Sequence, residues 1–222
     1  MTDFISYGCS VKNLIVTSRD THIMEVSGNH KYDRTNNDVT TFYAYNPPLK
    51  YIPKQLGFIF SNLKTIFITK SSLSLIEFRD FQNMKKLQKL YLPENQIEKV
   101  PFCVFKYVKN LEVIDLSGNQ IKALHEDTFT NLPNLLQFIC GDNDIEHLEN
   151  GLFRNNFNLK RVHMQENQLK TIEINFMKIK GIEVVDLRFN PCINLSFGCC
   201  KGIPLRDFQN QTSGNCNGPE VC

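Results

Sequence analysis

The residues that come closest to a catalytic arrangement are one histidine and one carboxylate, His163 and Asp186. They occupy the same outward position in two adjacent sequence units, and strands stacked about 4.8 Å apart would bring them within hydrogen-bonding reach. The candidate nucleophile Ser117 lies two units from His163, roughly 10 Å away on that spacing, which is too far for activation. The sequence contains no phosphate-cradling glycine loop, H-E-x-x-H motif or G-x-S-x-G motif. We therefore expect no catalytic residues, no metal site and no cofactor.

The elements that must position such side chains are sequence units with a period of 24 residues. Within a unit, apolar residues occupy positions one, four and six, and the last two suit alternate residues of a short strand that faces a core. A period in the twenties with the pattern L-x-x-L-x-L-x-x-N-x-L is the leucine-rich repeat signature. It predicts an α/β solenoid, a leucine-rich repeat horseshoe with a parallel β-sheet on its concave face. The seven units open at Val39, Leu63, Leu87, Leu111, Leu135, Leu159 and Ile182, the first being fainter and the last one residue early.

Two further columns of residues recur with the same period. Position nine is an asparagine, whose carboxamide offers both a donor and an acceptor and needs buried partners among apolar neighbours. Because stacked coils supply such partners from their backbones, we expect a structural ladder of Asn95, Asn119, Asn143, Asn167 and Asn190. A phenylalanine six residues before the next unit predicts an aromatic spine of Phe81, Phe105, Phe129, Phe153 and Phe176.

The repeats fill residues 39–190, and the flanking segments 1–38 and 191–222 are expected to be caps. A solenoid needs them because its terminal coils would otherwise expose their apolar core.

The N-terminal cap is expected to be a β-hairpin followed by a loop. Apolar residues at Val11 and Val16, a turn-like segment at 18–21 and further apolar residues at Ile23 and Val26 predict two arms that cover the edge of the sheet. The following segment, 28–38, is polar without apolar periodicity, which indicates a loop.

The C-terminal cap contains five of the eight cysteines, Cys192, Cys199, Cys200, Cys216 and Cys222. Cysteines clustered beyond the final repeat predict a disulfide-stapled cap. The competing interpretation, a zinc site, lacks paired C-x-x-C knuckles and any histidine in the tail. We expect Cys192 to pair with Cys216 around a short helix near Ile203 to Phe208, and Cys199 or Cys200 to pair with Cys222.

The other cysteines and two sequons bear on the compartment. Cys140 occupies strand position six, where other units have apolar residues, so it should be a buried free thiol. Cys103 should be exposed and free, and Cys9 should pair with a residue upstream of this chain. Asn194 and Asn210 begin glycosylation sequons beside the cysteine cluster. These features predict a secreted, extracellular protein, although the first residues show no secretory signal.

The repeat motif also carries a family resemblance. An N-x-I/L followed by V-P or an equivalent, a spine phenylalanine and N-L resembles the "typical" leucine-rich repeat class of extracellular proteins over 39–190. Asn-Pro-Cys at 190–192 is similar to the opening of that class's C-terminal cysteine cap. The segment VKNLIVTSRDTHIMEVSG is similar to small secreted leucine-rich repeat proteins of mosquitoes and midges. This resemblance implies a recognition or adhesion module, in innate immunity or at cell surfaces. The family's disulfide pairing cannot be carried over, because the cap lacks the usual tryptophan and C-x-C.

Function is therefore expected on the concave face, where the outward positions of seven strands would form a surface roughly 30 Å long. Aromatic residues gather in its N-terminal half and polar residues in its C-terminal half. The predicted binding residues are Tyr43, Tyr45, Phe67, Tyr91, Asp115, Ile139, His163, Asp186 and Arg188. Their leading interpretation is a face that binds a protein or glycan partner.

Charge and hydropathy narrow the other partner classes. The net charge is +2 and no run of Lys and Arg exists, so we expect no nucleic-acid partner. No apolar run is long enough to span a bilayer, so we expect no membrane insertion in this chain. Two alternatives stay open: a structural or adhesive matrix protein that self-associates, and the extracellular piece of a receptor.

Overall fold

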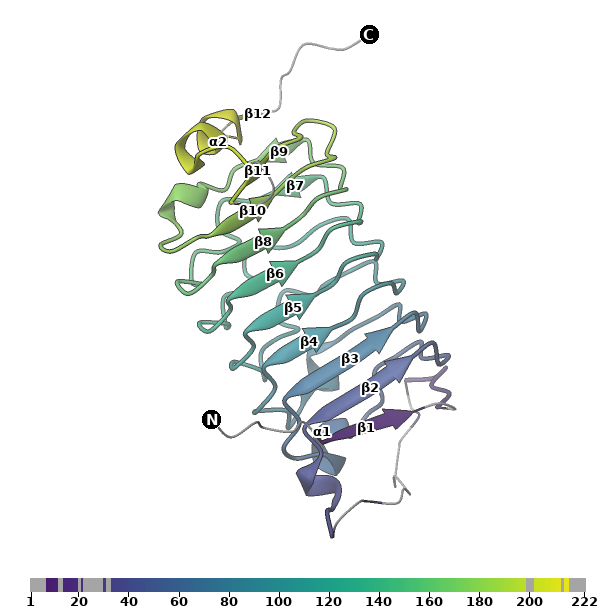
Figure 1. The fold of residues 1–222 in the computed structure, drawn as a ribbon. Helices are drawn as coiled ribbons and strands as arrows, with labels where there is room; N and C mark the ends of the chain where they lie inside the picture. The colour runs from purple at the N-terminus through teal and green to yellow at the C-terminus, as the bar shows by residue number, and fades with distance from the viewer. Residues whose placement is uncertain are drawn as a thin grey trace.

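A computed structural model describes residues 7–11, 14–19, 21, 30, 33–198, 202–212 and 214–215. The coils stack in one direction, and their strands lie side by side along one face of the stack (Figure 1). The strands are β1 (Gly8–Val11), β2 (Thr41–Tyr45), β3 (Thr65–Thr69), β4 (Lys89–Tyr91), β5 (Val113–Asp115), β6 (Gln137–Ile139), β7 (His147–Leu148), β8 (Arg161–His163), β9 (Thr171–Ile172), β10 (Val184–Asp186), β11 (Ser196–Phe197) and β12 (Gly214–Asn215). The helices are α1 (Leu56–Ile59) and α2 (Leu205–Thr212), with 3₁₀ turns at Asn36–Asp38, Phe78–Phe81 and Phe176–Lys178. Among the described residues, no helix is both long and apolar enough to cross a lipid bilayer.

The main sheet has nine strands in the order β1, β2, β3, β4, β5, β6, β8, β10 and β11. Neighbours from β1 to β10 are parallel, whereas β11 runs antiparallel to β10. The register places equivalent repeat positions side by side, as at Ile66, Leu90 and Ile114. These three side chains are fully buried, which leaves the residues before and after them on the outer face. The predicted parallel solenoid sheet is confirmed.

The core runs along the whole stack behind this sheet. The phenylalanine spine is buried, with ring centroids 6.1 Å apart for Phe105 and Phe129 and 5.6 Å apart for Phe129 and Phe153. A second row of parallel pairing, in which β7 pairs with β9 and Val100 with Leu124, closes the core opposite the main sheet. Each coil is therefore fixed to the next on two sides.

Asparagine side chains join each coil to the one before it. The Asn119 side chain accepts a hydrogen bond from the Ile97 backbone N–H at 3.0 Å. Its Nδ2 donates to the carbonyls of Leu92 at 3.0 Å and of its own coil's Leu116 at 2.9 Å. One buried carboxamide thus satisfies the backbones of two coils. The same contacts recur at Asn95, Asn143, Asn167 and Asn190.

The residue before each of these asparagines has a left-handed backbone. Its φ is 53° at Glu94, 63° at Gly118 and 54° at Asp142. A side chain in this conformation costs about 1–2 kcal/mol, so it needs surrounding structure to hold it. Backbone hydrogen bonds to the next coil provide that restraint with or without an asparagine, as from the Lys70 N–H to the Glu94 carbonyl at 3.0 Å and from the Glu94 N–H to the Ser117 carbonyl at 2.8 Å. The equivalent residues are Asn46, Lys70, Glu94, Gly118, Asp142, Glu166 and Phe189.

The described first arm of the predicted N-terminal hairpin pairs with the first repeat, and the hairpin itself stays a prediction. Strand β1 pairs in parallel with β2, aligning Cys9 with Phe42, and Val16 then pairs in parallel with Leu49. This segment therefore begins a further coil, because its apolar residues match the core positions of the repeat. The expected second arm, including Ile23, lies outside the described residues.

The C-terminal segment covers the last coil. Phe208 of α2 is buried, and its ring centroid lies 5.9 Å from that of Phe176. The Gln209 side chain accepts a hydrogen bond from the Phe176 backbone N–H at 2.6 Å. The expected helix near Ile203 to Phe208 is α2, which begins and ends later than predicted.

The cysteines fall into two groups. Cys9, Cys103 and Cys140 are free, and burial raises the pKa of the Cys9 and Cys140 thiols. Cys140 is completely buried, whereas Cys103 is half-buried where we expected it to be exposed. Cys192 is disulfide-bonded. Its pairing with Cys216 stays a prediction, because Cys199, Cys200, Cys216 and Cys222 lie outside the described residues.

An arginine clamp attaches the N-terminal segment to the second repeat. Arg19 Nη1 lies 2.9 Å from Glu77 Oε2 and 3.6 Å from Asp80 Oδ1, and its guanidinium carbon lies 4.9 Å from the centre of the Tyr51 ring. Asp80 is only 5% exposed. Burial raises the pKa of Asp80 to about 6, against the lowering effects of the Glu77 backbone N–H and of Arg19.

We expect the asparagine ladder to contribute measurably to stability. Asn119→Ala should lower the free energy of unfolding by about 1–3 kcal/mol, because buried backbone groups lose their partner. Asn110→Ala is the control, since Asn110 is exposed and its side chain donates a hydrogen bond to the Lys85 carbonyl at 2.8 Å. Denaturant unfolding of both variants measures the difference. Equal losses would contradict the structural role of the ladder.

Asp80 should make stability fall as pH rises. Its raised pKa means that between about pH 4 and pH 6 the folded chain holds a proton that the unfolded chain has released. The neutral variant Asp80→Asn should therefore gain on the wild type across this window, by at most about 3 kcal/mol. Unfolding measured from pH 4 to pH 7.5 tests this.

Asp38→Asn provides a control of opposite sign. Hydrogen bonds from the Thr35 backbone and hydroxyl hold the pKa of Asp38 below its ordinary value. The wild type should therefore lose stability relative to this variant only as the pH falls below about 4. A wild-type minus Asp80→Asn difference that stays constant with pH would refute the assignment to Asp80.

Candidate binding face

The register of the sheet places the predicted concave residues in one continuous column. Each strand contributes its position-five residue, whose preceding neighbour points into the core. Tyr43 is aligned with Phe67, Phe67 with Tyr91, and so on to His163 and Asp186 at the C-terminal end. The column therefore reads Tyr43, Phe67, Tyr91, Asp115, Ile139, His163 and Asp186.

The N-terminal half of this column is a ladder of aromatic rings. The ring centroids are 5.1 Å apart for Tyr43 and Phe67, which are stacked, and 5.6 Å apart for Phe67 and Tyr91, which are tilted. Phe67 and Tyr91 are half-buried by this contact, whereas Tyr43 is 39% exposed and Tyr45 is 53% exposed. Burial, followed by the negative charge of Asp115, raises the pKa of Tyr91.

An ion pair borders this aromatic ladder. Lys70 Nζ lies 3.2 Å from Glu94 Oε2 and 5.9 Å from the centre of the Tyr45 ring. The hydrogen bond to Glu94 is the main reason why the pKa of Lys70 is raised. A charged border around an aromatic centre is the usual composition of a protein interface.

The described part of the 28–38 loop lies at the ends of the strands. Asn37 accepts hydrogen bonds from the side chains of Ser61 at 2.9 Å and Asn62 at 2.7 Å. Tyr43 and Tyr45 keep the exposure given above. The contacts of Asn37 hold the described part of the loop to the next coil.

The C-terminal half of the face is polar and internally paired. Both oxygens of Asp186 accept hydrogen bonds from the Arg188 guanidinium, at 2.9 and 2.6 Å. Burial opposes ionisation of Asp186, but these contacts dominate and lower its pKa. Burial also lowers the pKa of His163, although Asp186 opposes this effect. At neutral pH the face thus presents a neutral imidazole beside a carboxylate and guanidinium pair.

This geometry suits binding rather than nucleophilic chemistry. The Ser117 hydroxyl donates to Asp115 Oδ1 at 2.6 Å, so its proton is held by its own strand. Both oxygens of Asp186 accept hydrogen bonds from Arg188, two residues along its own chain. In the described part of the chain, no group of three or more His, Cys, Asp and Glu side chains could hold a metal ion.

The two sequon asparagines lie in the C-terminal cap, and both are exposed. Asn194 Oδ1 accepts a hydrogen bond from the Phe189 backbone N–H at 2.9 Å, which leaves its Nδ2 to carry a glycan. Asn210 lies on α2. Glycosylation of either residue stays a prediction.

The repeats match a family model described as a BspA type leucine-rich repeat region, in six copies over residues 50–187. This match spans more than half of the chain. The chain belongs to the BspA-type leucine-rich repeat family. The subclass expected from the motif, the "typical" one, is not the subclass whose model matches. Repeat solenoids of this kind are generally scaffolds that present an extended concave binding surface.

Solved leucine-rich repeat structures share the fold of this BspA-type chain. The crystal structure of the APL1 leucine-rich repeat domain has a TM-score of 0.68 and 20% identity, covering 82% of this chain and 47% of that chain. For the LRIM1/APL1C complex the values are 0.65 and 22%, covering 76% and 32%. For InlP of Listeria monocytogenes they are 0.59 and 24%, covering 69% and 43%. These identities establish the fold alone, and this chain spans less than half the length of each structure. No curated protein sequence matches it.

The repeat period predicts which residues form the column of binding candidates, but it does not predict which of their side chains form pairs. The sequence suggested a contact between His163 and Asp186, which the sheet register aligns, but it did not reveal that Arg188 binds both oxygens of Asp186. The Lys70 and Glu94 pair occupies the left-handed position of adjacent coils. Their one-period spacing in the sequence was the signal that could have revealed this pair.

Proposed function

We propose that this chain is a secreted recognition module that binds a protein partner on its concave face. The observation that carries the proposal is the exposed aromatic column, with Tyr43 and Tyr45 at its open end. Neighbouring strands hold these rings in place, so little side-chain entropy is lost when a partner packs against them. Aromatic residues in such a setting commonly dominate binding energy.

The ring geometry favours a protein over a glycan. Sugars bind aromatic side chains mainly across a ring face, but the faces of Tyr43, Phe67 and Tyr91 are directed toward one another. Ring edges and two phenolic hydroxyls remain for contact, and these complement peptide groups and apolar side chains. The polar half then orients the partner through Asp115, His163 and Arg188.

Extracellular residence rests on the C-terminal cap. Cys192 is disulfide-bonded, and disulfides persist in oxidising compartments. Both sequon asparagines are exposed. The fold is shared with a solved complex between two leucine-rich repeat proteins, LRIM1 and APL1C, which illustrates a repeat protein with a protein partner. As the extracellular part of a receptor, the chain would bind a partner on the same concave face within a larger protein.

A structural or adhesive role is the second candidate, and large apolar side chains outside the sheet favour it. Phe58 is 65% exposed, Phe102 is 58% exposed and Phe157 is 72% exposed. Such residues suit contacts between copies of the chain. Affinity capture from extracellular fluid separates the two roles: recognition yields a different soluble protein, whereas adhesion yields the chain itself.

We expect the two exposed tyrosines to carry the interaction. Tyr43→Ala and Tyr45→Ala should each weaken binding of the captured protein by about 2 kcal/mol, with little change in melting temperature. Phe67 and Tyr91 are less suitable probes, because their rings also pack against neighbours. Titration calorimetry with the purified partner measures the loss.

The matched control exchanges an equally exposed aromatic residue on another surface. Phe102 and Lys106 lie outside the sheet, so the variants Phe102→Ala and Lys106→Ala should bind the partner with unchanged affinity. If the Phe102 variant lost binding while both tyrosine variants kept it, the binding site would have to be moved off the concave face.

A further inference from the structure

The turn that follows strand β7 contains an asparagine directly before a glycine, Asn150 and Gly151. The Leu152 backbone N–H donates to the Glu149 carbonyl at 3.1 Å, which places Asn150 and Gly151 at the two central positions of the turn. Asn150 is exposed and Gly151 is half-buried. Among the asparagines that the structure describes, Asn150 alone precedes a glycine.

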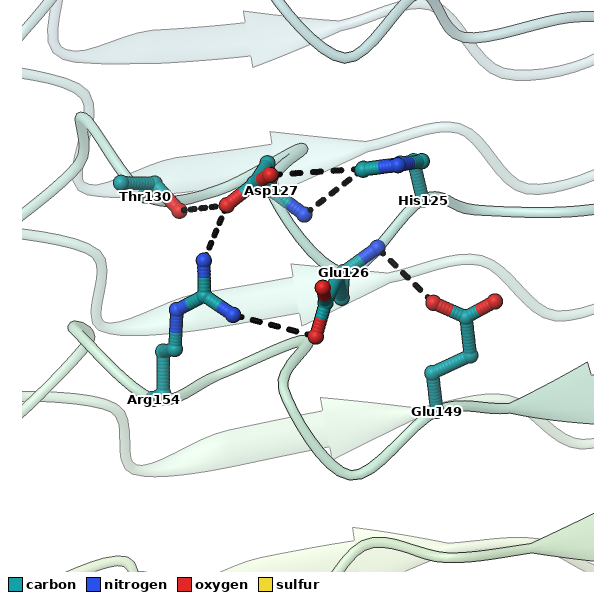
Figure 2. A network of polar contacts seen from close by, with 6 residues as sticks. All are labelled: His125, Glu126, Asp127, Thr130, Glu149 and Arg154. Carbon is teal, nitrogen blue, oxygen red and sulfur yellow. Dashed lines mark hydrogen bonds and ion pairs between the residues drawn. The ribbon is translucent and has the colours of Figure 1, made fainter.

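An ion pair between two coils lies directly against the Cα atom of Gly151. Arg154 Nη1 lies 3.0 Å from Glu126 Oε2 of the preceding coil, and the same guanidinium contacts Asp127 (Figure 2). A Cβ atom on Gly151 would overlap with Glu126 Oε2 and would lie 2.9 Å from Arg154 Nη1. The Glu149 side chain accepts a hydrogen bond from the Glu126 backbone N–H at 3.1 Å. The absence of a side chain at Gly151 therefore allows the contacts that join this turn to the preceding coil.

The polar groups of this Asn-Gly pair are available for reaction. Among the described residues, neither the Gly151 backbone N–H nor the Asn150 side chain has a hydrogen-bond partner. The turn is closed by the N–H of the next residue, Leu152, so the Gly151 N–H is not needed for it. Both residues also line an open cavity of about 520 Å³, so water reaches the peptide bond between them.

Asn131 of the preceding coil provides a comparison within the same molecule. It is exposed, and its side chain likewise has no hydrogen-bond partner among the described residues. The residue after it is Leu132, which is fully buried and whose backbone N–H donates to the Phe129 carbonyl at 3.0 Å. The two asparagines therefore differ chiefly in the residue that follows and in whether its N–H is bound.

We propose that Asn150 is a site of spontaneous deamidation and isoaspartate formation, with water as the only other reactant. The Gly151 backbone nitrogen attacks the side-chain carbonyl carbon of Asn150, so a new nitrogen–carbon bond forms and the carbon–amine bond breaks. The Gly151 amide proton leaves with the amine as ammonia, and a cyclic succinimide remains. Water then adds to either ring carbonyl, which opens the ring to aspartate or to isoaspartate. Glycine favours ring closure because it has no side chain to restrict its backbone.

Isoaspartate at this position disrupts the contacts between the two coils. It routes the backbone through the side chain and adds a methylene group before Gly151. Gly151 has no room for the resulting shift, because Glu126 and Arg154 already lie against it. Since each coil contacts only its neighbours, the disruption stays local. Asn150 takes no part in the concave face, so this site is independent of the proposed function.

Ageing of the intact chain tests the proposal. Samples held at neutral and at mildly alkaline pH are digested, and mass spectrometry measures the conversion of Asn150 and of Asn131 in the same samples. Asn150 should convert at least about tenfold faster, because a bound N–H and a buried leucine raise the barrier to ring closure at Asn131. Conversion should accelerate as the pH rises, because the attacking nitrogen must lose its proton. Equal rates at the two asparagines would overturn the proposal.

Labelling by an isoaspartyl methyltransferase identifies the isomer on the folded chain. A second Asn-Gly pair, Asn217 and Gly218, lies outside the described residues, so the labelling uses an Asn217→Gln background. Label should accumulate with age in this background. Asn150→Gln should remove most of the label, because the longer side chain does not form the same ring. Label that persists undiminished in the Asn150→Gln variant would also overturn the site.

Hydrogen exchange tests the effect on the turn. Amides of residues 149–155 should exchange faster in the aged chain than in the fresh chain, whereas those of β4 should not change. Asn150→Asp adds the charge without lengthening the backbone and should exchange like the fresh chain, because exposed charges contribute little. An aged chain that contains isoaspartate at position 150 and exchanges like the fresh chain would refute the disruption.

Discussion

The buried asparagine carboxamide is the interaction on which this solenoid depends. Each ladder residue donates to three backbone carbonyls and accepts at least one backbone N–H at the point where the chain leaves the sheet. That geometry fixes the distance and register between coils. The asparagine follows directly after the left-handed residue of its coil, a conformation that six of seven units adopt without glycine. Sheet, spine and turn are consistent with one another because this one side chain satisfies the backbone of two coils.

Much of this fold could be predicted from the sequence because a repeat makes its constraints visible as columns. The strand core, asparagine ladder and phenylalanine spine each require one residue type, and the period follows from them. The left-handed position could not be found in this way. Asn46, Lys70, Glu94 and Phe189 share no side-chain chemistry, since the requirement there concerns the backbone alone. The N-terminal coil was missed for a related reason: Cys9 and Val16 fill core positions without any leucine to mark them.

The candidate face was predictable in position but not in interaction. Period and strand alternation determine which residues point outward, and the register brings Tyr43, Phe67 and Tyr91 together as expected from their spacing. How neighbours then satisfy one another depends on rotamers and on competition between partners. Asp186 illustrates this, because Arg188 approaches it from the same strand end with two donors, whereas His163 offers at most one. Sequence spacing cannot rank such competitors.

Residues that repeat in every coil maintain the fold, whereas residues that differ between coils can recognise a partner. Positions that repeat cannot discriminate a partner, because every coil would present the same group. Position five carries five residue types over seven strands, and that variety divides the face into an aromatic and a polar half.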